Sequence, residues 1–436
     1  MLNPFLSIPL ILAAILAVPL AAQEAAPATA AARPAQAQQP GSYSGRILMR
    51  SKKAKTISIE VGKGDKAETF TLRHDDATKG LEHAVADLHA IVLSELRDGE
   101  EMVVEVKPKI APIPEGITDL DTAAVQALLA GATPFQLIDS RPRGRWLQAH
   151  LPKSVSLPDD ELQEKGAAAL LPADTSLPLV FYCGGVTCGL STASAKLARA
   201  AGYTSVSVYQ AGEPAWSKAG NPTYAATSFI AEDNIILIDL RDPAVVAAGA
   251  IARAISVPAA GIAAAAEETL PVRAPIVLYG VDDAQGMAAR EILLKNEFKR
   301  VSLVEGGFTG WKAAGGGTVT GPLPTTVAWK RKPVKGEVEL ATFQQAVAGD
   351  RAGVVILDVR GPAELAGGTV PDALNIPLDQ LAKRLTEVPK GKKVYVFCNS
   401  GARAEMAVKA LVKQGYDARF LVADIDCEGG NCTFSE

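Results

Sequence analysis

The chain has 436 residues, which exceeds one ordinary domain and gives a prior expectation of roughly three. Its 44 basic and 48 acidic residues leave a net charge of −4, so the charge balance gives no support for nucleic-acid binding. Hydrophobic residues make up 48% of the sequence but aromatic residues only 5%, and this composition fits small α/β units better than a β-sandwich.

The first 40 residues read as a targeting segment followed by a linker. Residues 5–22 are apolar and end in Leu20-Ala21-Ala22-Gln23, which resembles a secretory signal with a small-residue cleavage site, although residues 1–4 carry no Lys or Arg. We therefore expect residues 1–22 to be a signal peptide. The protein would be periplasmic or secreted, or membrane-anchored if the segment is not cleaved. Residues 23–40 are rich in Ala, Pro and Gln and predict a disordered linker.

Residues 41–110 are expected to form a separate small β-domain. Apolar and polar residues alternate along several runs, and Gly-containing turns separate these runs. The alternating apolar positions are Ile57, Ile59 and Val61, then Phe70 and Leu72, then Met102, Val104 and Val106. The pattern predicts a half-buried sheet, in the form of a small barrel resembling an OB-fold. A basic cluster reads either as a solvated edge strand or as a docking surface for an acidic partner or an anionic headgroup. Its members are Arg46, Arg50, Lys52, Lys53 and Lys55.

The rest of the chain repeats one pattern three times. Each repeat has a β-run that ends in Asp-x-Arg, then a segment that ends in Pro, then a second apolar strand. The Asp-x-Arg triplets are Asp139-Ser140-Arg141, Asp239-Leu240-Arg241 and Asp358-Val359-Arg360. Strands that alternate with helical stretches predict a parallel sheet with helices on both faces, and ligands bind at the carboxyl ends of such strands. We place the three units at residues 115–226, 227–322 and 334–436.

The loop after the second strand differs from repeat to repeat. The first loop is Cys183-Gly184-Gly185-Val186-Thr187-Cys188, the second begins with Gly280, and the third is Cys398-Asn399-Ser400-Gly401-Ala402-Arg403. A thiol at this place lies among inward-pointing backbone N–H groups and before a helix N-terminus. These dipoles favour a thiolate and any anion bound to it. Arg403 is expected to add a fixed positive charge to the third loop.

The third repeat resembles the active-site region of rhodanese-family sulfurtransferases. The resemblance covers the Cys-x-x-Gly-x-Arg loop, the Asp-x-Arg strand end and the segment 370–377, with Thr369 where the family usually has His. It implies that Cys398 takes a sulfane sulfur, becomes a persulfide and passes the sulfur to a thiol or to cyanide. Residues 399–403 would bind the sulfur donor, and neither a metal nor an organic cofactor is implied.

The Asp-x-Arg residues are expected to be structural. We expect their ion pairs to fix the geometry of the loops rather than to take part in the chemistry. Glu364 is expected to pair with Arg360. His150 matches the usual His of the family, and we interpret it as a structural hydrogen-bonding group. The residues assigned to this structural role are Asp358 and Arg360 in the third repeat and Asp139 and Arg141 in the first.

The first repeat has two thiols in one loop and no Arg. The missing Arg argues against the related dual-specificity phosphatases. We expect Cys183, at the strand end, to carry the persulfide, with Gly184 and Gly185 as binding residues. Cys188 would resolve this persulfide as a disulfide. A plain structural disulfide within the loop is the alternative.

The second repeat is expected to be catalytically inactive. Gly280 stands where the cysteine should be, and it cannot act as a nucleophile. Asp282 and Asp283 would repel an anionic sulfur donor. The repeat also shows no clear leading helix before Ile235. We interpret it as a scaffold between the other two repeats.

The third repeat departs from the other two at its end, where Cys427 and Cys432 replace a Gly-Gly and Trp signature. We expect both cysteines to face Cys398, and three roles stay open. Sulfur would pass from Cys398 to a tail thiol, or the tail disulfide would report the redox state, or the disulfide would simply tie down the C-terminal segment.

Together these patterns predict an exported sulfurtransferase that carries sulfane sulfur on a cysteine. Its partners would be thiosulfate, polysulfide or another persulfide, together with a possible acceptor protein. Two alternatives remain. One is a periplasmic thiol-disulfide redox protein, against which the absence of a Cys-x-x-Cys motif counts. The other is a non-catalytic sulfur-binding scaffold.

Overall fold

The computed structural model describes residues 41–52, 54–62, 67–86, 88–349, 351, 353–428 and 431–435. The expected signal peptide and linker, at 1–22 and 23–40, lie outside the described residues. Within the described ranges, no helix has both the length and the apolar character needed to cross a bilayer.

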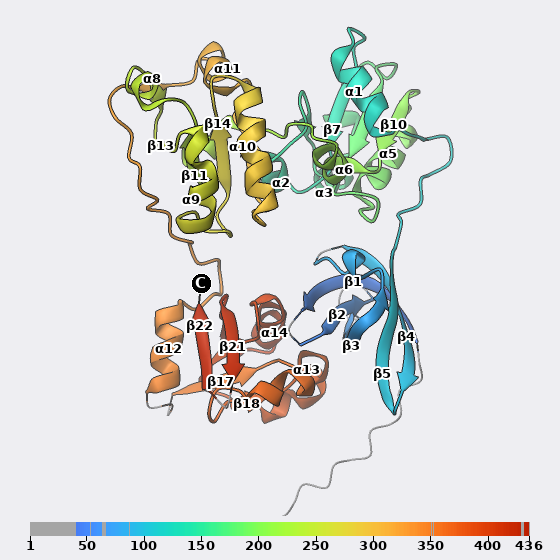
Figure 1. Cartoon of the computed structure of the whole chain (residues 1–436). Helices are drawn as coiled ribbons and strands as arrows, with labels where there is room; N and C mark the ends of the chain where they lie inside the picture. The colour runs from blue at the N-terminus through green and yellow to red at the C-terminus, as the bar shows by residue number, and fades with distance from the viewer. Residues whose placement is uncertain are drawn as a thin grey trace, which may run out of the picture. The chain divides into compact units, whose positions relative to one another are not determined.

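The N-terminal domain is a closed five-stranded barrel, drawn in blue in Figure 1. Its strands are β1 (Ser42–Ser51), β2 (Thr56–Val61), β3 (Glu68–Lys79), β4 (His89–Arg97) and β5 (Glu100–Pro108), with a short 3-10 helix at Leu81–His83. They pair in the order β1-β2-β3-β5-β4, and β1 also pairs with β4. Ile47, Ile57, Ile59 and Val92 are fully buried inside. The expected β-rich domain is therefore confirmed. Its resemblance to an OB-fold stays a prediction.

The first α/β unit has a parallel sheet in the order β6-β10-β9-β7-β8. Its strands are β6 (Thr118–Asp119), β7 (Gln136–Asp139), β8 (Val155–Ser156), β9 (Leu179–Tyr182) and β10 (Val206–Tyr209). Its helices are α1 (Thr122–Ala130), α2 (Arg143–Gln148), α3 (Asp159–Lys165), α4 (Ala167–Leu170), α5 (Leu190–Ala200) and α6 (Gly212–Lys218). One hydrophobic cluster contains Ile138 and Phe181 and the other contains Leu137 and Val180. Since neighbouring strand residues point to opposite faces, both faces of the sheet are buried.

The second α/β unit has a four-stranded parallel sheet in the order β13-β11-β14-β15. Its strands are β11 (Ile236–Asp239), β13 (Ile255–Ser256), β14 (Ile276–Tyr279) and β15 (Val301–Leu303), and a separate antiparallel pair joins β12 (Ala250–Ile251) to β16 (Thr318–Val319). Its helices are α7 (Thr227–Glu232), α8 (Pro243–Ala247), the 3-10 helix Ala259–Gly261, α9 (Ile262–Glu268), α10 (Asp283–Lys295) and α11 (Gly307–Ala313). The expectation that no helix precedes Ile235 is wrong. Helix α7 is held there by buried Phe229 and Ile230, and its six residues are too few for a clear periodic pattern.

The third α/β unit has a parallel sheet in the order β18-β17-β19-β20. Its strands are β17 (Val354–Asp358), β18 (Leu374–Asn375), β19 (Lys393–Phe397) and β20 (Asp417–Phe420). Its helices are α12 (Leu340–Ala348), the 3-10 helices Pro362–Gly367 and Leu385–Glu387, α13 (Leu378–Arg384) and α14 (Ala402–Lys413). A C-terminal hairpin follows, made of β21 (Asp424–Glu428) and β22 (Asn431–Ser435), both drawn in red in Figure 1. The expected tandem α/β units with parallel sheets and flanking helices are thus confirmed.

Candidate active site

The Cys398 loop lies between β19 and α14, at the carboxyl end of a central strand of the third sheet. Cys398 is fully buried, and the backbone N–H of Gly401 donates a hydrogen bond to its sulfur at 3.2 Å. Gly401 has φ of 94°, and a Cβ atom there would meet the Leu421 carbonyl oxygen at 3.0 Å. Only glycine fits this position without strain. Helix α14 begins at the next residue, so its N-terminus adds partial positive charge near the sulfur.

Glu364 organises this loop from the 3-10 helix that follows β17. Its carboxylate accepts both terminal N–H groups of Arg403, at 2.5 and 2.7 Å. It also accepts the side-chain amide of Asn399 at 2.7 Å and the backbone N–H of Gly361 at 3.0 Å. The expected Glu364–Arg360 pair is therefore wrong, because Arg403 approaches the carboxylate from α14. Sequence reasoning missed this link, which joins residues 39 positions apart.

Arg403 is an interior residue, with only 1% of its side chain exposed. Burial by itself would raise the pKa of Glu364, but the hydrogen bonds and charge of Arg403 outweigh burial and lower it. Both partners are therefore ionised, and they largely neutralise each other. Arg403 carries the expected fixed positive charge, and this charge acts on Cys398. Because Glu364 accepts both of its terminal N–H groups, Arg403 also positions the loop, and backbone dipoles add to the local anion-stabilising field.

The Asp-x-Arg triplets form the same structure in all three repeats. In each, the Arg side chain folds back onto the Asp two residues earlier and also donates to a main-chain carbonyl eight residues ahead. The Arg–Asp distances are 2.6 Å for Arg141–Asp139, 2.6 Å for Arg241–Asp239 and 2.7 Å for Arg360–Asp358. The carbonyls belong to Ala149, Gly249 and Gly368. These buried pairs brace the chain after each strand.

The family histidine position differs between the first and third repeats. Thr369 stands at this position in the third repeat, and its hydroxyl donates a hydrogen bond to the Asp358 carboxylate at 2.7 Å. His150 has its Nδ1 at 2.9 Å from the Trp146 carbonyl and stacks on the Trp146 ring at 4.1 Å. Burial lowers the pKa of His150. Both residues make structural contacts in the described fold.

The first loop holds Cys183 and Cys188 as free thiols. Cys183 is fully buried, and its thiol lies 3.1 Å from the Cys188 carbonyl oxygen and 3.2 Å from the Ser191 hydroxyl. Cys188 is half-buried. A hydrogen bond from the Cys183 thiol is the main cause that lowers the pKa of Cys188 to about 6. The same bond, followed by burial, raises the pKa of Cys183 well above its ordinary value.

The second loop is filled by a side chain. A Cβ atom on Gly280 would lie 2.3 Å from the side-chain oxygen of Gln285. That oxygen accepts the Val281 N–H at 3.2 Å, and the amide group donates to Leu240 at 3.0 Å. Asp282 caps α10 by accepting the N–H groups of residues 284 and 285. Sequence reasoning missed Gln285, which occupies the space that a cysteine would need.

Asp283 also has a structural role. Its carboxylate accepts the Tyr224 hydroxyl at 2.7 Å and the Gly306 backbone N–H at 2.9 Å. The two carboxylates of the second loop are therefore both engaged in hydrogen bonds within the fold, in addition to any repulsion they exert on an anion.

Cys427 and Cys432 form a disulfide across the C-terminal hairpin. The hairpin starts beside the Cys398 loop, since the Ile425 N–H donates to the Asn399 carbonyl at 3.3 Å. Both cysteines nevertheless pack in the cluster that contains Phe397, whereas Cys398 packs in the cluster that contains Ala404 of α14. Adjacent strand residues point to opposite faces. The expectation that the tail cysteines face Cys398 therefore needs correction.

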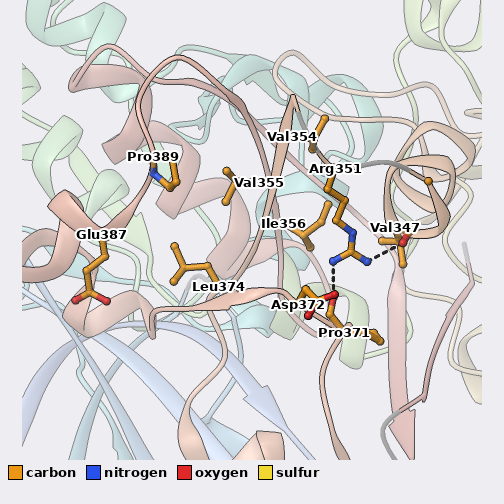
Figure 2. Close-up of a pocket in the computed structure, with 11 residues that line it drawn as sticks. Val347, Arg351, Val354, Val355, Ile356, Pro371, Asp372, Leu374, Glu387 and Pro389 are labelled. Atoms are coloured by element: carbon orange, nitrogen blue, oxygen red, sulfur yellow. Dashed lines mark hydrogen bonds between the residues drawn. The ribbon is translucent and has the colours of Figure 1, made fainter. Parts of the chain in front are cut away.

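A cavity of about 720 Å³ lies at the other end of the third sheet. Figure 2 shows it beside Val354, at the start of β17, with Arg351 bonded to the carbonyls of Val347 and Pro371. Cys398 follows the carboxyl end of the neighbouring strand β19, which runs parallel to β17. The cavity is thus separate from the cysteine loop. In the described part of the chain, no group of three or more His, Cys, Asp or Glu side chains is arranged to hold a metal ion.

The comparison with protein families supports the resemblance seen in the sequence. The model of the rhodanese-like domain matches residues 121–219, 224–314 and 341–426. These matches cover more than half of the chain and all three α/β units. The chain belongs to the rhodanese-like domain family.

Individual relatives match parts of the chain. A sulfurtransferase of Allochromatium vinosum is 40% identical over 80 residues, which are 18% of this chain and 74% of that protein. A Mycobacterium tuberculosis protein with the provisional name thiosulfate sulfurtransferase SseB is 30% identical over 173 residues, 33% of this chain and 60% of that protein. A thiosulfate sulfurtransferase structure from Pseudomonas aeruginosa is 20% identical with a TM-score of 0.23, covering 73% of this chain and 68% of that chain.

Proposed function

We propose that this protein is a sulfurtransferase in which Cys398 carries sulfane sulfur as a persulfide. The observation that carries the proposal is the cradle around Cys398. Its sulfur accepts the Gly401 N–H at 3.2 Å, at the start of the twelve-residue helix α14. Such a cradle stabilises a thiolate and the negative charge of a persulfide equally well, because both place an anion at the same helix N-terminus. Sulfurtransferase relatives support sulfur transfer in general.

The proposed reaction has two displacements on sulfur. The Cys398 thiolate attacks the outer sulfur of thiosulfate, the bond between the two donor sulfurs breaks, and sulfite leaves with the electron pair. An acceptor thiolate or cyanide then attacks the outer sulfur of the persulfide, and the Cys398 thiolate is released again. The buried Glu364–Arg403 pair holds the loop in place during both steps.

Thiosulfate as donor and export as location are the finer parts of this proposal. Thiosulfate is suggested by the provisional name of the Mycobacterium tuberculosis relative. Polysulfide and other persulfides offer the same electrophilic sulfur and are alternative donors. Export is supported only by the apolar sequence at residues 5–22, with its small-residue end.

The test is sulfur transfer from thiosulfate to cyanide, measured on the full chain and on the variants C398S and C183S. We expect C398S to abolish transfer and C183S to retain it, because only the third loop combines the thiol with the Gly401 donor and the Glu364–Arg403 brace. Retained activity in C398S would contradict the proposal. A wild-type protein inactive with both thiosulfate and polysulfide would favour the redox or scaffold alternatives.

A further inference from the structure

The first repeat holds a second sulfur site whose geometry differs from that of Cys398. Its two thiols lie in one loop before α5, and the Cys183 thiol donates to the Cys188 main-chain carbonyl at 3.1 Å. Cys183 has no exposed surface, and the Ser191 hydroxyl and the Cys188 carbonyl enclose its sulfur. Cys188 is half-buried and hence the more accessible of the two. An incoming donor therefore meets Cys188 first.

The anion-stabilising groups of this loop gather around Cys188. The Cys183 thiol, and after it the backbone N–H groups of Leu190 and Gly184, lower the pKa of Cys188 to about 6, and Leu190 is the first residue of the eleven-residue helix α5. The positive charge of Arg141 acts on the same sulfur. Arg141 belongs to the buried Asp-x-Arg pair and lies 3.6 Å from Glu213. These groups favour Cys188 as the thiolate of the first loop, although Cys183 is the thiol that directly follows its strand, as Cys398 does in the third repeat.

We propose that Cys188 is the sulfur-accepting nucleophile of the first repeat, and that Cys183 then releases the bound sulfur as sulfide. This reverses the roles expected from the sequence, where Cys183 came first because it directly follows the strand. The inference extends the proposed function, because it uses the same class of sulfane donor. Its product is different, since the third repeat would transfer sulfur unchanged in oxidation state while the first would reduce it.

The chemistry balances in two steps. The Cys188 thiolate attacks the outer sulfur of thiosulfate, and sulfite leaves, so that Cys188 carries a persulfide. The Cys183 sulfur then attacks the inner persulfide sulfur, the bond to the outer sulfur breaks, and that sulfur leaves as hydrosulfide with the Cys183 proton. Two thiols are oxidised to one disulfide, and one sulfane sulfur is reduced to sulfide. A dithiol reductant, either a small molecule or a protein, is needed only to start a second cycle.

The experiment uses the full chain with the C398S substitution, so that the third repeat has no thiol in its loop to accept sulfur. The protein is reduced, freed of reductant and mixed with excess thiosulfate. Released sulfide is measured, and intact and peptide masses locate added sulfur and new disulfides. Two further variants carry C183S or C188S in the same background. Iodoacetamide labelling of C398S before thiosulfate is added compares the accessibility of the two thiols at neutral pH.

We expect C398S to release one sulfide per chain and to form a Cys183–Cys188 disulfide. With C183S added, no sulfide is released, and a persulfide stays on Cys188. With C188S added, the protein neither gains sulfur nor releases sulfide. Iodoacetamide should label Cys188 and spare Cys183. The inference is overturned if the persulfide forms on Cys183, if C188S retains sulfide release, or if C398S shows neither sulfide nor a new disulfide.

Failure of this inference can be told apart from failure of the proposed function. The C183S, C188S double variant keeps Cys398 and is treated with thiosulfate in the same way. A persulfide on Cys398 with no reaction in the C398S protein would uphold the proposed function and reject the inference. Sulfide release from C398S with no persulfide on Cys398 in the double variant would uphold the inference and reject the proposed function.

Discussion

At the scale of single residues, the Cys398 loop shows how a buried charge can serve positioning rather than binding. Arg403 is buried, and Glu364 accepts both of its terminal N–H groups. Glu364 also holds Asn399, which directly follows the cysteine. One carboxylate therefore links the 3-10 helix after β17, the loop and the first turn of α14. The geometry of the cysteine depends on a residue that never needs to touch the donor.

Replacing Glu364 by Gln should strongly destabilise this region. The substitution leaves the Arg403 cation buried and poorly paired, and breaking such a pair costs about 3–5 kcal/mol. We expect faster hydrogen exchange in the α14 peptide of the full chain and a loss of sulfur transfer. The matched control is E387Q, which breaks the Arg384–Glu387 pair. Those side chains are 35% and 45% exposed and screened by water, so hydrogen exchange in the α14 peptide should stay as in the wild type.

The effect of E364Q should depend on pH. Since the pKa of Glu364 is lowered in the folded protein, its charge stabilises the fold at pH values above the ordinary pKa range of a carboxyl group. That stabilisation is lost as the pH falls through the lowered pKa. The difference in hydrogen exchange of the α14 peptide between wild type and E364Q should therefore be largest at neutral pH and should become small at acidic pH. A difference that stays constant down to strongly acidic pH would contradict the ion-pair explanation.

At the scale of secondary-structure elements, the junction between β19 and α14 determines where the sulfur lies. The strand ends at Phe397, and the helix begins at Ala402, so four residues must turn the chain and aim N–H groups inward. Gly401 makes this turn through its positive φ and its close approach to Leu421. The same junction in the first repeat runs from Cys183 to Gly189, and its greater length brings a second cysteine into the cradle.

The substitution G401A tests this junction. A side chain at φ of 94° and 3.0 Å from a carbonyl oxygen should add about 1–3 kcal/mol of strain and move the N–H away from the sulfur. Because about 1.4 kcal/mol corresponds to a tenfold change in rate, we expect thiosulfate–cyanide transfer to fall about tenfold or more. The control is G415A, which also has a positive φ of 79° but open space around a Cβ atom. It should lower stability yet leave the transfer rate unchanged, and equal losses in both variants would refute the argument.

The C-terminal hairpin provides a second test at this scale. The Cys427–Cys432 disulfide closes a separation of only five residues and packs on the sheet face opposite Cys398. The double variant C427S, C432S should speed hydrogen exchange in β21 and β22. The loss should lie at or below the usual range of about 2–4 kcal/mol, because a short loop gains less from closure. Persulfide formation on Cys398 should not change. A marked loss of transfer by this variant would restore the relay from Cys398 to the tail.

At the scale of the whole molecule, one framework is used three times with three different loops. The Asp-x-Arg braces are nearly identical, so the sheets hold their strand ends in the same way. The differences are confined to the segment between the second strand and the following helix. It carries one thiol in the third repeat, two in the first and a filled space in the second. Within this chain, the loop therefore changes while its support stays the same.

The second repeat should resist conversion into a sulfur site by a single substitution. The variant G280C would place its new side chain 2.3 Å from the Gln285 oxygen, so the introduced thiol should not accept sulfur from thiosulfate. The measurement is the intact mass of a chain that also lacks Cys183, Cys188 and Cys398. The double variant G280C, Q285A removes the obstructing amide. Sulfur uptake by the double variant alone would assign the block to Gln285, and uptake by G280C alone would contradict the prediction.

The sequence by itself determined the architecture, because that information is local and repeated. Alternating apolar residues predicted the N-terminal barrel, and strands that alternate with helical stretches in three repeats predicted the parallel sheets. Strand, thiol, small-residue loop and helix follow one another in the third repeat, so the candidate nucleophile could be read from residues 394–415 alone. The short helix α7 was missed, since six residues give too little periodic signal.

Only the tertiary structure decided how the loops are organised, because the deciding contacts join residues far apart in the chain. Glu364 meets Arg403 across 39 residues, and Leu240 meets Gln285 across 45. The order of the two thiols in the first loop was also beyond the sequence. The order that we propose rests on burial, since Cys183 is fully buried and Cys188 is half-buried. Spacing along the chain predicts which groups are available, whereas folding determines which of them meet.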